Sequence, residues 1–272
     1  MHLGDRMKLY EELSGSLPKL FPLLPAHARL DGKCFSTFTR GLATPYDERL
    51  TKLMVAVTTS LVDHFAASIG YTQSDEISLL WYSDDIKSQI PHDGRRDKLN
   101  TDLATFCCNE FNRLLPDHLP EKVNKTRIPQ FDCRVWNTPT IAEAANSFLW
   151  RERDATRNSI LSSGAKYYSH KQLFKKNITE IQNMLHQKGV NWNDYPNFFK
   201  RGTFVQRRKE ITKFSTDEID RLPAKHLARS NPDLEIERSV VKVVDSVPPF
   251  PEITNKAGFI FHGEYPSKKP EV

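Results

Sequence analysis

Apolar residues recur at helical spacing in two segments of the first half of the chain. The first predicted helix starts at Thr44–Asp47, with Thr44 as cap, Pro45 as first helical residue and Asp47 bonding back to the cap, and ends near residues 68–70. The second covers residues 98–115, with one apolar face. The apolar positions are Leu50, Leu53, Met54, Val57, Leu61, Val62 and Phe65 in the first helix, and Leu99, Leu103, Phe106, Cys107, Phe111 and Leu114 in the second.

Short β-prone runs alternate with these helices. His27–Leu30 predicts a strand that ends at the turn pair Asp31-Gly32. Residues 70–82 predict two strands joined by a polar turn at Ser74-Asp75-Glu76, and residues 131–136 predict another strand. The order of these elements predicts an α+β fold, in which an antiparallel sheet carries helices on one face.

The pattern changes after Pro139. Residues 141–163 predict a long helix with a dense polar middle, and residues 177–188 predict a helix that ends at Gly189. Residues 200–209 predict a basic strand-like segment, and the proline-containing C-terminus is expected to wrap the surface. We therefore divide the chain into a catalytic region, residues 1–140, and a largely helical, basic extension, residues 141–272.

Composition limits the class of protein. Hydrophobic residues make up 38% of the chain and charged residues 27%, which is typical of a soluble globular protein. No run approaches the roughly 20 apolar residues that span a bilayer, and Met1–Arg6 lacks the apolar core of a signal peptide. These features predict a cytoplasmic protein without membrane contact.

Net charge and the positions of the cysteines limit the class of protein less than the composition does. A net charge of +5 suits a polyanionic partner without establishing one. The four cysteines are scattered and form no CxxC motif, so we expect reduced packing residues and no zinc site. They are Cys34, Cys107, Cys108 and Cys133.

Two acidic positions could carry chemistry. Asp31 ends a predicted strand and is followed by Gly32, where backbone can approach a ligand closely, and the N–H groups of residues 32–36 could cradle phosphates. Asp75 and Glu76 lie on a neighbouring hairpin. Carboxylates from adjacent strands can hold two magnesium ions for nucleotidyl transfer. Taken alone, however, each site is more typical of an ordinary solvated turn.

The amino-acid sequences of these motifs favour the metal site. Residues 29–35 and 70–78 resemble the two signature blocks of the tRNA-His guanylyltransferase family, and residues 131–135 resemble its next block. Phe148–Arg151 followed by Asp154 resembles its helical block, and residues 195–208 resemble its late basic block. The resemblance spans about residues 4–210 in the family's order.

The resemblance implies a polymerase-like palm that adds guanylate or templated nucleotides to the 5′ end of tRNA in the 3′-to-5′ direction, using ATP and GTP. It also implies a homotetramer built as a dimer of dimers, with the extension contacting tRNA or partner subunits. Catalysis would rest on Asp31, Asp75 and Glu76, and two Mg²⁺ ions would be bound by Asp31, the Gly32 carbonyl and Asp75. The implied nucleotide contacts are Asp31, Gly32, Lys33, Cys34, Phe35, Ser36, Ser74, Asp75, Arg95, Lys98 and Arg134.

One departure changes the expected substrate. Eukaryotic members carry a His-Ile-Asn-Asn run where this chain has Thr156-Arg157-Asn158-Ser159. That replacement resembles the bacterial, archaeal and viral guanylyltransferase-like branch, which repairs truncated tRNA 5′ ends. Arg157 could replace the lost histidine as a phosphate contact. Two alternatives share the palm: a nucleotide cyclase, although the turn lacks the expected GG(D/E)EF wording, and a non-catalytic RNA-binding protein.

Several other residues have more than one interpretation. His27 and His170 could act as bases but are more typical of structural histidines. The tryptophans at 136, 150 and 192 could stack on bases, with packing the more frequent role. Residues 167–171 suit either tRNA or a subunit interface, and residues 200–209 suit either a phosphate backbone or solvent.

Overall fold

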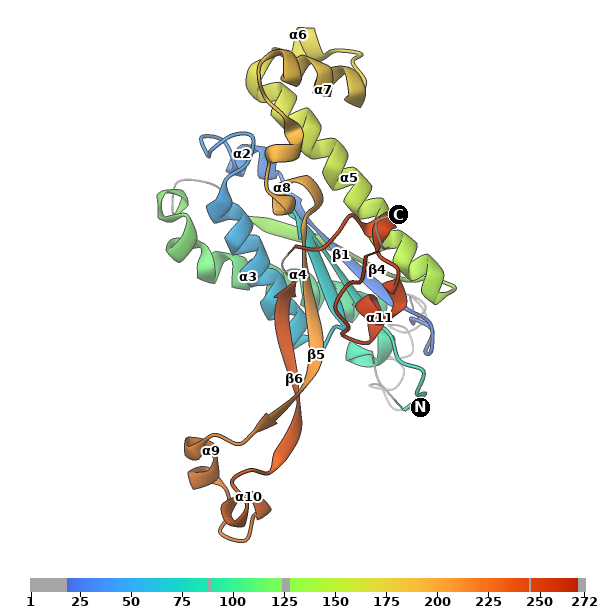
Figure 1. The fold of residues 1–272 in the computed structure, drawn as a ribbon, viewed down its shortest axis with the longest axis vertical. Coiled ribbons are helices and arrows are strands. Elements are labelled where there is room, and N and C mark those ends of the chain that lie inside the picture. The colour runs from blue at the N-terminus through green and yellow to red at the C-terminus, as the bar shows by residue number, and fades with distance from the viewer. Residues whose placement is uncertain (1–18, 88–89, 124–127, 245, 269–272) are drawn as a thin grey trace, which may run out of the picture.

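The computed structural model describes residues 19–87, 90–123, 128–244 and 246–268. Within them, one six-stranded sheet has the order β4-β1-β3-β2-β5-β6, and every neighbouring pair is antiparallel. The predicted α+β class with an antiparallel sheet is confirmed (Figure 1). The strands are β1 (Ala26–Lys33), β2 (Ile69–Gln73), β3 (Glu76–Trp81), β4 (Gln130–Asn137), β5 (Thr203–Lys213) and β6 (Glu235–Val244).

The helices fall into long elements that cover the sheet and short ones at its periphery. The helices are α2 (Phe35–Phe38), α3 (Glu48–His64), α4 (Arg96–His118), α5 (Ile141–Tyr167), α6 (His170–Leu173), α7 (Ile178–Gln187), α8 (Asn197–Arg201), α9 (Thr216–Arg221), α10 (Leu227–Ser230) and α11 (Lys256–Phe261). Short 3₁₀ turns cover η1 (Pro91–Gly94), η2 (Pro120–Lys122), η3 (Trp192–Asp194) and η4 (Phe250–Glu252).

Residue alternation along the strands divides the sheet into two covered faces. Leu30 of β1 and Ile77 of β3 belong to the core formed with α3 and α4. Tyr71 of β2 and Phe204 of β5 pack on the other face against Phe148 of α5. The expected helices on one face are therefore α3 and α4, while α5 of the extension covers the second face. Because β5 and β6 also come from the extension, the boundary near residue 140 runs through a single sheet.

Two local predictions were wrong in detail. The first strand does not end at Asp31-Gly32, because β1 stays paired with β4 as far as Lys33, and the chain turns at Cys34, whose φ is 60°. The first helix is capped by Asp47, which accepts a hydrogen bond from the Arg49 N–H, so Thr44 and Pro45 precede the helix. This helix ends at His64, before the predicted 68–70, since Ile69 already pairs in β2.

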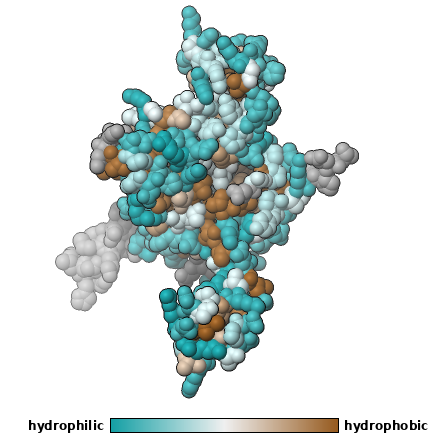
Figure 2. Space-filling model, turned by 60° about the vertical axis from the view of Figure 1, so that its left-hand side comes forward, coloured by the Kyte–Doolittle hydropathy of each residue, from teal (hydrophilic) through white to brown (hydrophobic). Residues whose placement is uncertain are grey.

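Two projections extend from this body. The far half of α5 carries α6 and α7 away from the sheet at one end, and β5 and β6 continue beyond it as a hairpin that ends in α9 and α10 (Figure 1). In the space-filling view both projections stand out as separate lobes (Figure 2). No helix in the described ranges is long and apolar enough to cross a membrane. Met1–Arg6 and Pro270 lie outside the described residues.

A buried carboxylate on α5 holds the C-terminal segment. Glu152 is only 5% exposed, and its two carboxylate oxygens accept the Phe250 N–H at 2.9 and 3.1 Å. Phe250 and Phe259 are fully buried against the α5 face of the sheet. Burial raises the pKa of Glu152 from 4.5 to about 7. The predicted surface wrap of the C-terminus thus includes buried anchor residues.

The raised pKa of Glu152 predicts a pH-dependent stability. The folded protein holds the Glu152 proton more tightly than the unfolded chain, so the group's contribution to folding is favourable at low pH and declines as the pH rises from 4.5 to about 7. A shift of this size corresponds to on the order of 3 kcal/mol. Glu152→Gln keeps an acceptor for Phe250 and cannot ionise, so it should remove this decline. Urea unfolding of both proteins at about pH 5 and about pH 8 measures the difference, and parallel pH profiles would contradict it.

Candidate active site

Backbone pairing brings the two predicted aspartates together. Asp31 lies near the end of β1, directly opposite Glu76 of β3, and the next residue, Gly32, donates its N–H to the Asp75 carbonyl at 3.1 Å. Asp75 occupies the two-residue turn between β2 and β3 with Ser74, whose φ is 52°. A non-glycine residue at positive φ is uncommon, and here it sharpens the turn that presents Asp75. The strand end and the turn therefore form one acidic edge of the sheet.

Gly32 is required by the close packing at this edge. A Cβ at this position would lie 2.4 Å from the Phe35 ring and 2.8 Å from Asp75 Oδ2. The missing side chain lets the Asp75 carboxylate rest against the β1 backbone. Burial raises the pKa of Asp75, and the neighbouring Asp31 contributes in the same direction. A desolvated carboxylate next to another acid is a position where a bound cation is stabilising.

Glu76 has a different environment from Asp75, although the two are adjacent. Arg151 of α5 donates from Nε and Nη2 to the two Glu76 oxygens at 2.7 and 2.8 Å, and from Nη2 to Asp154 at 2.8 Å. Arg29 approaches Glu76 to 3.9 Å from β1. Burial raises the pKa of Glu76, and Arg151 and Arg29 oppose that shift. The Glu76 carboxylate is thus engaged by arginines and ties α5 to the sheet.

A cavity opens between this edge and α5. It is lined by the acidic residues of the strand ends and by Asp154 and Asn158, which lie one helical turn apart on α5. Asn158 Nδ2 donates to Asp154 at 3.2 Å. The full lining is Arg29, Asp31, Gln73, Ser74, Asp75, Glu76, Arg151, Asp154 and Asn158.

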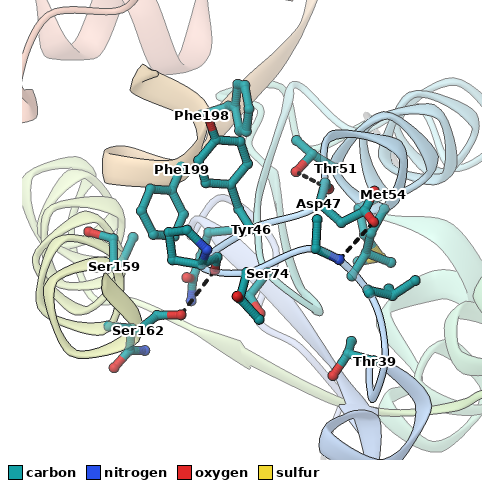
Figure 3. A pocket seen from close by; sticks show the side chains of 18 of the residues that line it. Thr39, Tyr46, Asp47, Thr51, Met54, Ser74, Ser159, Ser162, Phe198 and Phe199 are labelled. Carbon is teal, nitrogen blue, oxygen red and sulfur yellow. Dashed lines mark hydrogen bonds between the residues drawn. The ribbon is translucent and has the colours of Figure 1, made fainter. Parts of the chain in front are cut away.

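A second cavity, of about 330 Å³ against about 480 Å³ for the first, adjoins it and shares Gln73, Ser74 and Asn158 with it. Figure 3 shows Tyr46, Phe198 and Phe199 on one side of this cavity, with Ser159 and Ser162 of α5 beside them. The rings of Tyr46 and Phe199 are 4.8 Å apart, and those of Tyr46 and Phe198 are 5.3 Å apart. Aromatic walls beside hydroxyl groups suit a planar polar ligand.

The loop that borders the aromatic-walled cavity is fixed by an acidic cap. Asp47 is 7% exposed and accepts hydrogen bonds from the Ala43 N–H at 3.2 Å and from the Arg49 N–H at 3.0 Å. The Arg49 guanidinium also donates hydrogen bonds to the Asp47 carboxylate and, together with these N–H groups, lowers the pKa of Asp47 to about 2. Asp47 therefore stays ionised and holds residues 43–47 in place.

A hydrogen bond between β2 and α8 anchors the aromatic wall of the cavity. The buried Tyr71 hydroxyl donates to the Arg201 carbonyl at 2.7 Å, at the end of α8. Gly202 follows with φ 78°, and a Cβ there would lie 2.5 Å from the Tyr71 hydroxyl. The glycine permits both the positive φ and the close approach of Tyr71. This contact fixes α8, which carries Phe198 and Phe199, relative to the sheet.

The residues at the acidic edge fit magnesium better than a closed protein metal site. No group of three or more His, Cys, Asp or Glu side chains in the described part of the chain is arranged to hold a metal. Asp31 and Asp75 form no ion pair with a described basic residue, while nearby Arg29 and Arg151 pair with Glu76. Magnesium commonly uses one or two carboxylates and completes its shell with water and phosphate oxygens.

The structure gathers some predicted site residues and separates others. Asp31, Ser74, Asp75 and Glu76 line one cavity, with Gly32 beside them. Lys33 ends β1, Cys34 is exposed, and Phe35 is buried in an aromatic cluster, so its side chain cannot contact a ligand. Ser36 lies in α2 and Arg134 on β4 opposite Arg29, outside the cavity lining. Arg95 and Lys98 lie at the start of α4, on the helix that covers the other face of the sheet, and line neither cavity.

Sequence reasoning missed the contribution of α5 and of the aromatic wall. From the sequence, the residues Arg151, Asp154 and Asn158 stand out only as members of a family motif or of the polar part of a predicted helix. Their spacing of three and four residues places them along one face of a helix, which is the available signal. The aromatic wall unites residues 46 and 198–199, and no local pattern could have joined segments so far apart. Thr156 bonds the Lys200 carbonyl at 3.2 Å, and Arg157 is exposed outside the cavity lining.

The alternative candidates occupy structural positions. His27 is 2% exposed, its ring stacks on Trp136 at 5.3 Å, and burial lowers its pKa to about 4. Trp192 is also buried, and its Nε1 donates to Ser159 at 3.0 Å. His170 is exposed at the start of α6, far along α5 from the acids. These contacts match packing roles for His27 and Trp192.

Comparison with known proteins gives a consistent result. The family profile described as tRNAHis guanylyltransferase matches residues 4–139. The tRNA(His) guanylyltransferase of Saccharomyces cerevisiae is 30% identical over 211 residues, which cover 71% of this chain and 87% of that protein. A bacterial tRNA(His) guanylyltransferase-like protein in complex with ATP superposes with a TM-score of 0.70 and 34% identity, over 75% of this chain and 88% of that one. A bacterial tRNA(His) guanylyltransferase-like protein in complex with GTP superposes with a TM-score of 0.67 and 27% identity, over 92% and 94% of the two chains.

The Arg151–Glu76 pair predicts an asymmetric stability effect. Both side chains are 9% exposed, so Arg151→Met leaves a buried carboxylate without its main partner. We expect a loss of about 3–5 kcal/mol in the free energy of unfolding, measured with urea. The double variant Arg151→Met, Glu76→Leu removes the stranded charge and should recover at least about half of it. Arg153→Met, an exposed neighbour, should change stability by less than about 0.5 kcal/mol. Equal losses in the single and double variants would refute the buried-pair interpretation.

Proposed function

The chain belongs to the tRNA(His) guanylyltransferase family, and from that premise we propose that it is a magnesium-dependent nucleotidyltransferase acting on the 5′ end of tRNA. The observation that carries the proposal is the continuity of the two cavities. One of them has an aromatic wall suited to a nucleobase, and it opens beside the carboxylates of Asp31 and Asp75, which form no ion pair within the described residues. A nucleoside triphosphate bound with its base against Tyr46 and Phe199 would extend its phosphates toward those acids.

The residues of the chain have distinct proposed roles. Asp31, the Gly32 carbonyl and Asp75 would hold Mg²⁺, which when bound would neutralise phosphate charge and ease loss of the attacking hydroxyl's proton. Backbone N–H groups of residues 33–36 would bind triphosphate oxygens. Glu76 positions Arg151 and α5 and is not proposed as a metal ligand, because its oxygens are taken by arginine N–H groups.

The proposed reaction extends RNA in the 3′-to-5′ direction. The 3′-hydroxyl oxygen of the incoming nucleotide attacks the α-phosphorus of the RNA's 5′-triphosphate. A phosphodiester bond forms, the bond from the α-phosphorus to the pyrophosphate breaks, and the hydroxyl proton leaves to solvent. An RNA with a 5′-monophosphate would first be activated by ATP or GTP. The protein's part is positioning and charge stabilisation, which are the main contributions in phosphoryl transfer.

The substrate proposed is a tRNA with a truncated 5′ end. Thr156 stands where the histidine of eukaryotic members lies and bonds the Lys200 carbonyl of α8. The bacterial guanylyltransferase-like proteins that the chain resembles bind ATP or GTP in their structures, which supports both nucleotides as substrates here. Templated repair is therefore proposed over strict addition of one guanylate to tRNA-His. A homotetramer and a cytoplasmic place of action stay predictions from the resemblance.

Replacement of either metal-binding acid tests the central assignment. Asp31→Ala and Asp75→Ala should each lower nucleotide addition to 5′-triphosphorylated tRNA by at least about 1,000-fold, equivalent to about 4 kcal/mol of transition-state stabilisation. Asp117→Ala, an exposed residue of α4 outside both cavities, should stay within about twofold of the parent. Circular dichroism controls for folding. Undiminished addition by either acid variant would sink the assignment.

Magnesium dependence separates a catalyst from a catalytically inactive palm. The unmodified protein should bind GTP more tightly with Mg²⁺ than with EDTA, and this difference should disappear in Asp75→Ala.

A paired substrate assay tests the preference for repair. The protein is given full-length tRNA-His and a tRNA lacking its first nucleotide, both with 5′-triphosphates, and each of the four nucleoside triphosphates in turn. We expect kcat/KM for the truncated tRNA with the nucleotide that pairs with its template position to exceed that for full-length tRNA-His by at least about tenfold. Addition limited to guanylate on tRNA-His would instead identify a strict guanylyltransferase.

A further inference from the structure

We propose that Trp150 is a stacking platform for the terminal base of the RNA strand that enters the acidic site. This inference rests on the proposed function, since it assigns the second substrate to a place beside the acids. Trp150 is 53% exposed, whereas Trp81 and Trp192 are 6% and 7% exposed and Trp136 is half-buried against His27. An indole with this exposure leaves about half of its surface free for a contact outside the core.

The position of Trp150 on α5 relates it to both cavities. Trp150, Asp154, Asn158 and Ser162 follow at four-residue intervals and therefore form one stripe of neighbouring side chains that winds gradually around the helix. Asn158 and Ser162 line the aromatic-walled cavity, and Asp154 and Asn158 line the acidic cavity. The stripe therefore runs from the proposed nucleotide cavity, past the acids, to Trp150. If a nucleoside triphosphate fills the aromatic-walled cavity, the RNA strand that it joins lies on the far side of the acids, which is the side of Trp150.

Two arginines, the buried Arg151 and the partly buried Arg29, hold the indole in place. The Arg151 guanidinium lies 4.4 Å from the Trp150 ring centroid, and that of Arg29 lies 5.6 Å from it. Both arginines are also bound to Glu76, so the platform is joined to the acidic edge by contacts of 2.7 to 3.9 Å. Cation–π contacts fix the ring and leave exposed surface on which a base can stack. Stacking on an aromatic ring is tolerant of sequence, as a repair enzyme acting on many tRNAs requires.

Further cations lie near the platform. Arg134 lies directly opposite Arg29 in the β1–β4 pairing, and its side chain is 64% exposed, 4.0 Å from the carboxylate of Asp132. Arg153, also exposed, is on the same helix as Trp150. An exposed ring with cations around it complements a base and its adjoining phosphates better than it complements an apolar protein surface. We therefore commit to RNA as the occupant.

The test compares Trp150 variants on two RNAs. One is a 5′-triphosphorylated tRNA lacking its first nucleotide, and the other is identical except that its 5′-terminal nucleotide is abasic. Trp150→Ala should raise KM for the first RNA about tenfold and change KM for the nucleoside triphosphate by less than about twofold. Trp150→Phe should stay within about threefold of the parent. On the abasic RNA, the parent and Trp150→Ala should have equal KM values. Phe174→Ala, which removes another exposed aromatic ring beyond α6, should have no effect on either RNA.

Two kinetic outcomes for Trp150→Ala would overturn the inference: an equal increase of KM on both RNAs, or no increase on either. A third is an altered sedimentation coefficient of Trp150→Ala with unchanged RNA kinetics, which would identify a subunit contact. The same two RNAs are also compared by equilibrium binding, with the fluorescence anisotropy of a dye at the RNA 3′ end as the signal. If the parent protein adds no nucleotide to any RNA, the proposed function fails while the binding comparison still decides the stacking role. A base-dependent binding loss in Trp150→Ala would support it, and its absence would refute it.

Discussion

The arrangement of the site depends on one buried ion pair between the sheet and the long helix. Arg151 bonds both oxygens of Glu76 and also reaches Asp154, so α5 is fixed across β1 and β3 at the level of the acids. The pair sets how far the wall of α5 stands from Asp31 and Asp75, and therefore how much space a triphosphate finds between them. Such pairs contribute little net stability relative to apolar packing. The two parallel bonds of this pair nevertheless define one orientation of α5 on the sheet. Here orientation is what the chemistry needs.

The sequence was sufficient for elements whose signals are local. The apolar periodicity of α3 and α4, the β-prone runs of β1 and β3 and the polar turn at Ser74-Asp75 each appear within a short window of the sequence. Details of their ends were less accessible. The strand β1 runs past Asp31-Gly32 because the partner strand β4 and the Asp75 carbonyl supply hydrogen bonds that a turn would have left unmade. A tertiary partner thus outweighed the local turn preference of Asp-Gly.

The candidate site divides in the same manner. Asp31 and Asp75 could be identified because each belongs to a compact motif, and the antiparallel pairing then brings them together. Neither the aromatic wall nor the ties of Arg151 could be inferred locally, since they join segments more than 70 residues apart. Arg95 and Lys98 were assigned by a looser correspondence, and they lie at the start of α4, outside the lining of both cavities. Their role as nucleotide contacts stays a prediction.

The four-residue stripe on α5 has a consequence for how such a protein can change over time. A helix advances by about 100° per residue, so deleting or inserting a single residue between Trp150 and Ser162 would swing every later wall residue about a quarter-turn away from the sheet. Substitution at any one position leaves the others in place. The helix therefore tolerates substitutions along the stripe but not insertions or deletions within it. In lineages that retain this site, the segment between Trp150 and Ser162 should vary in identity while its length stays constant.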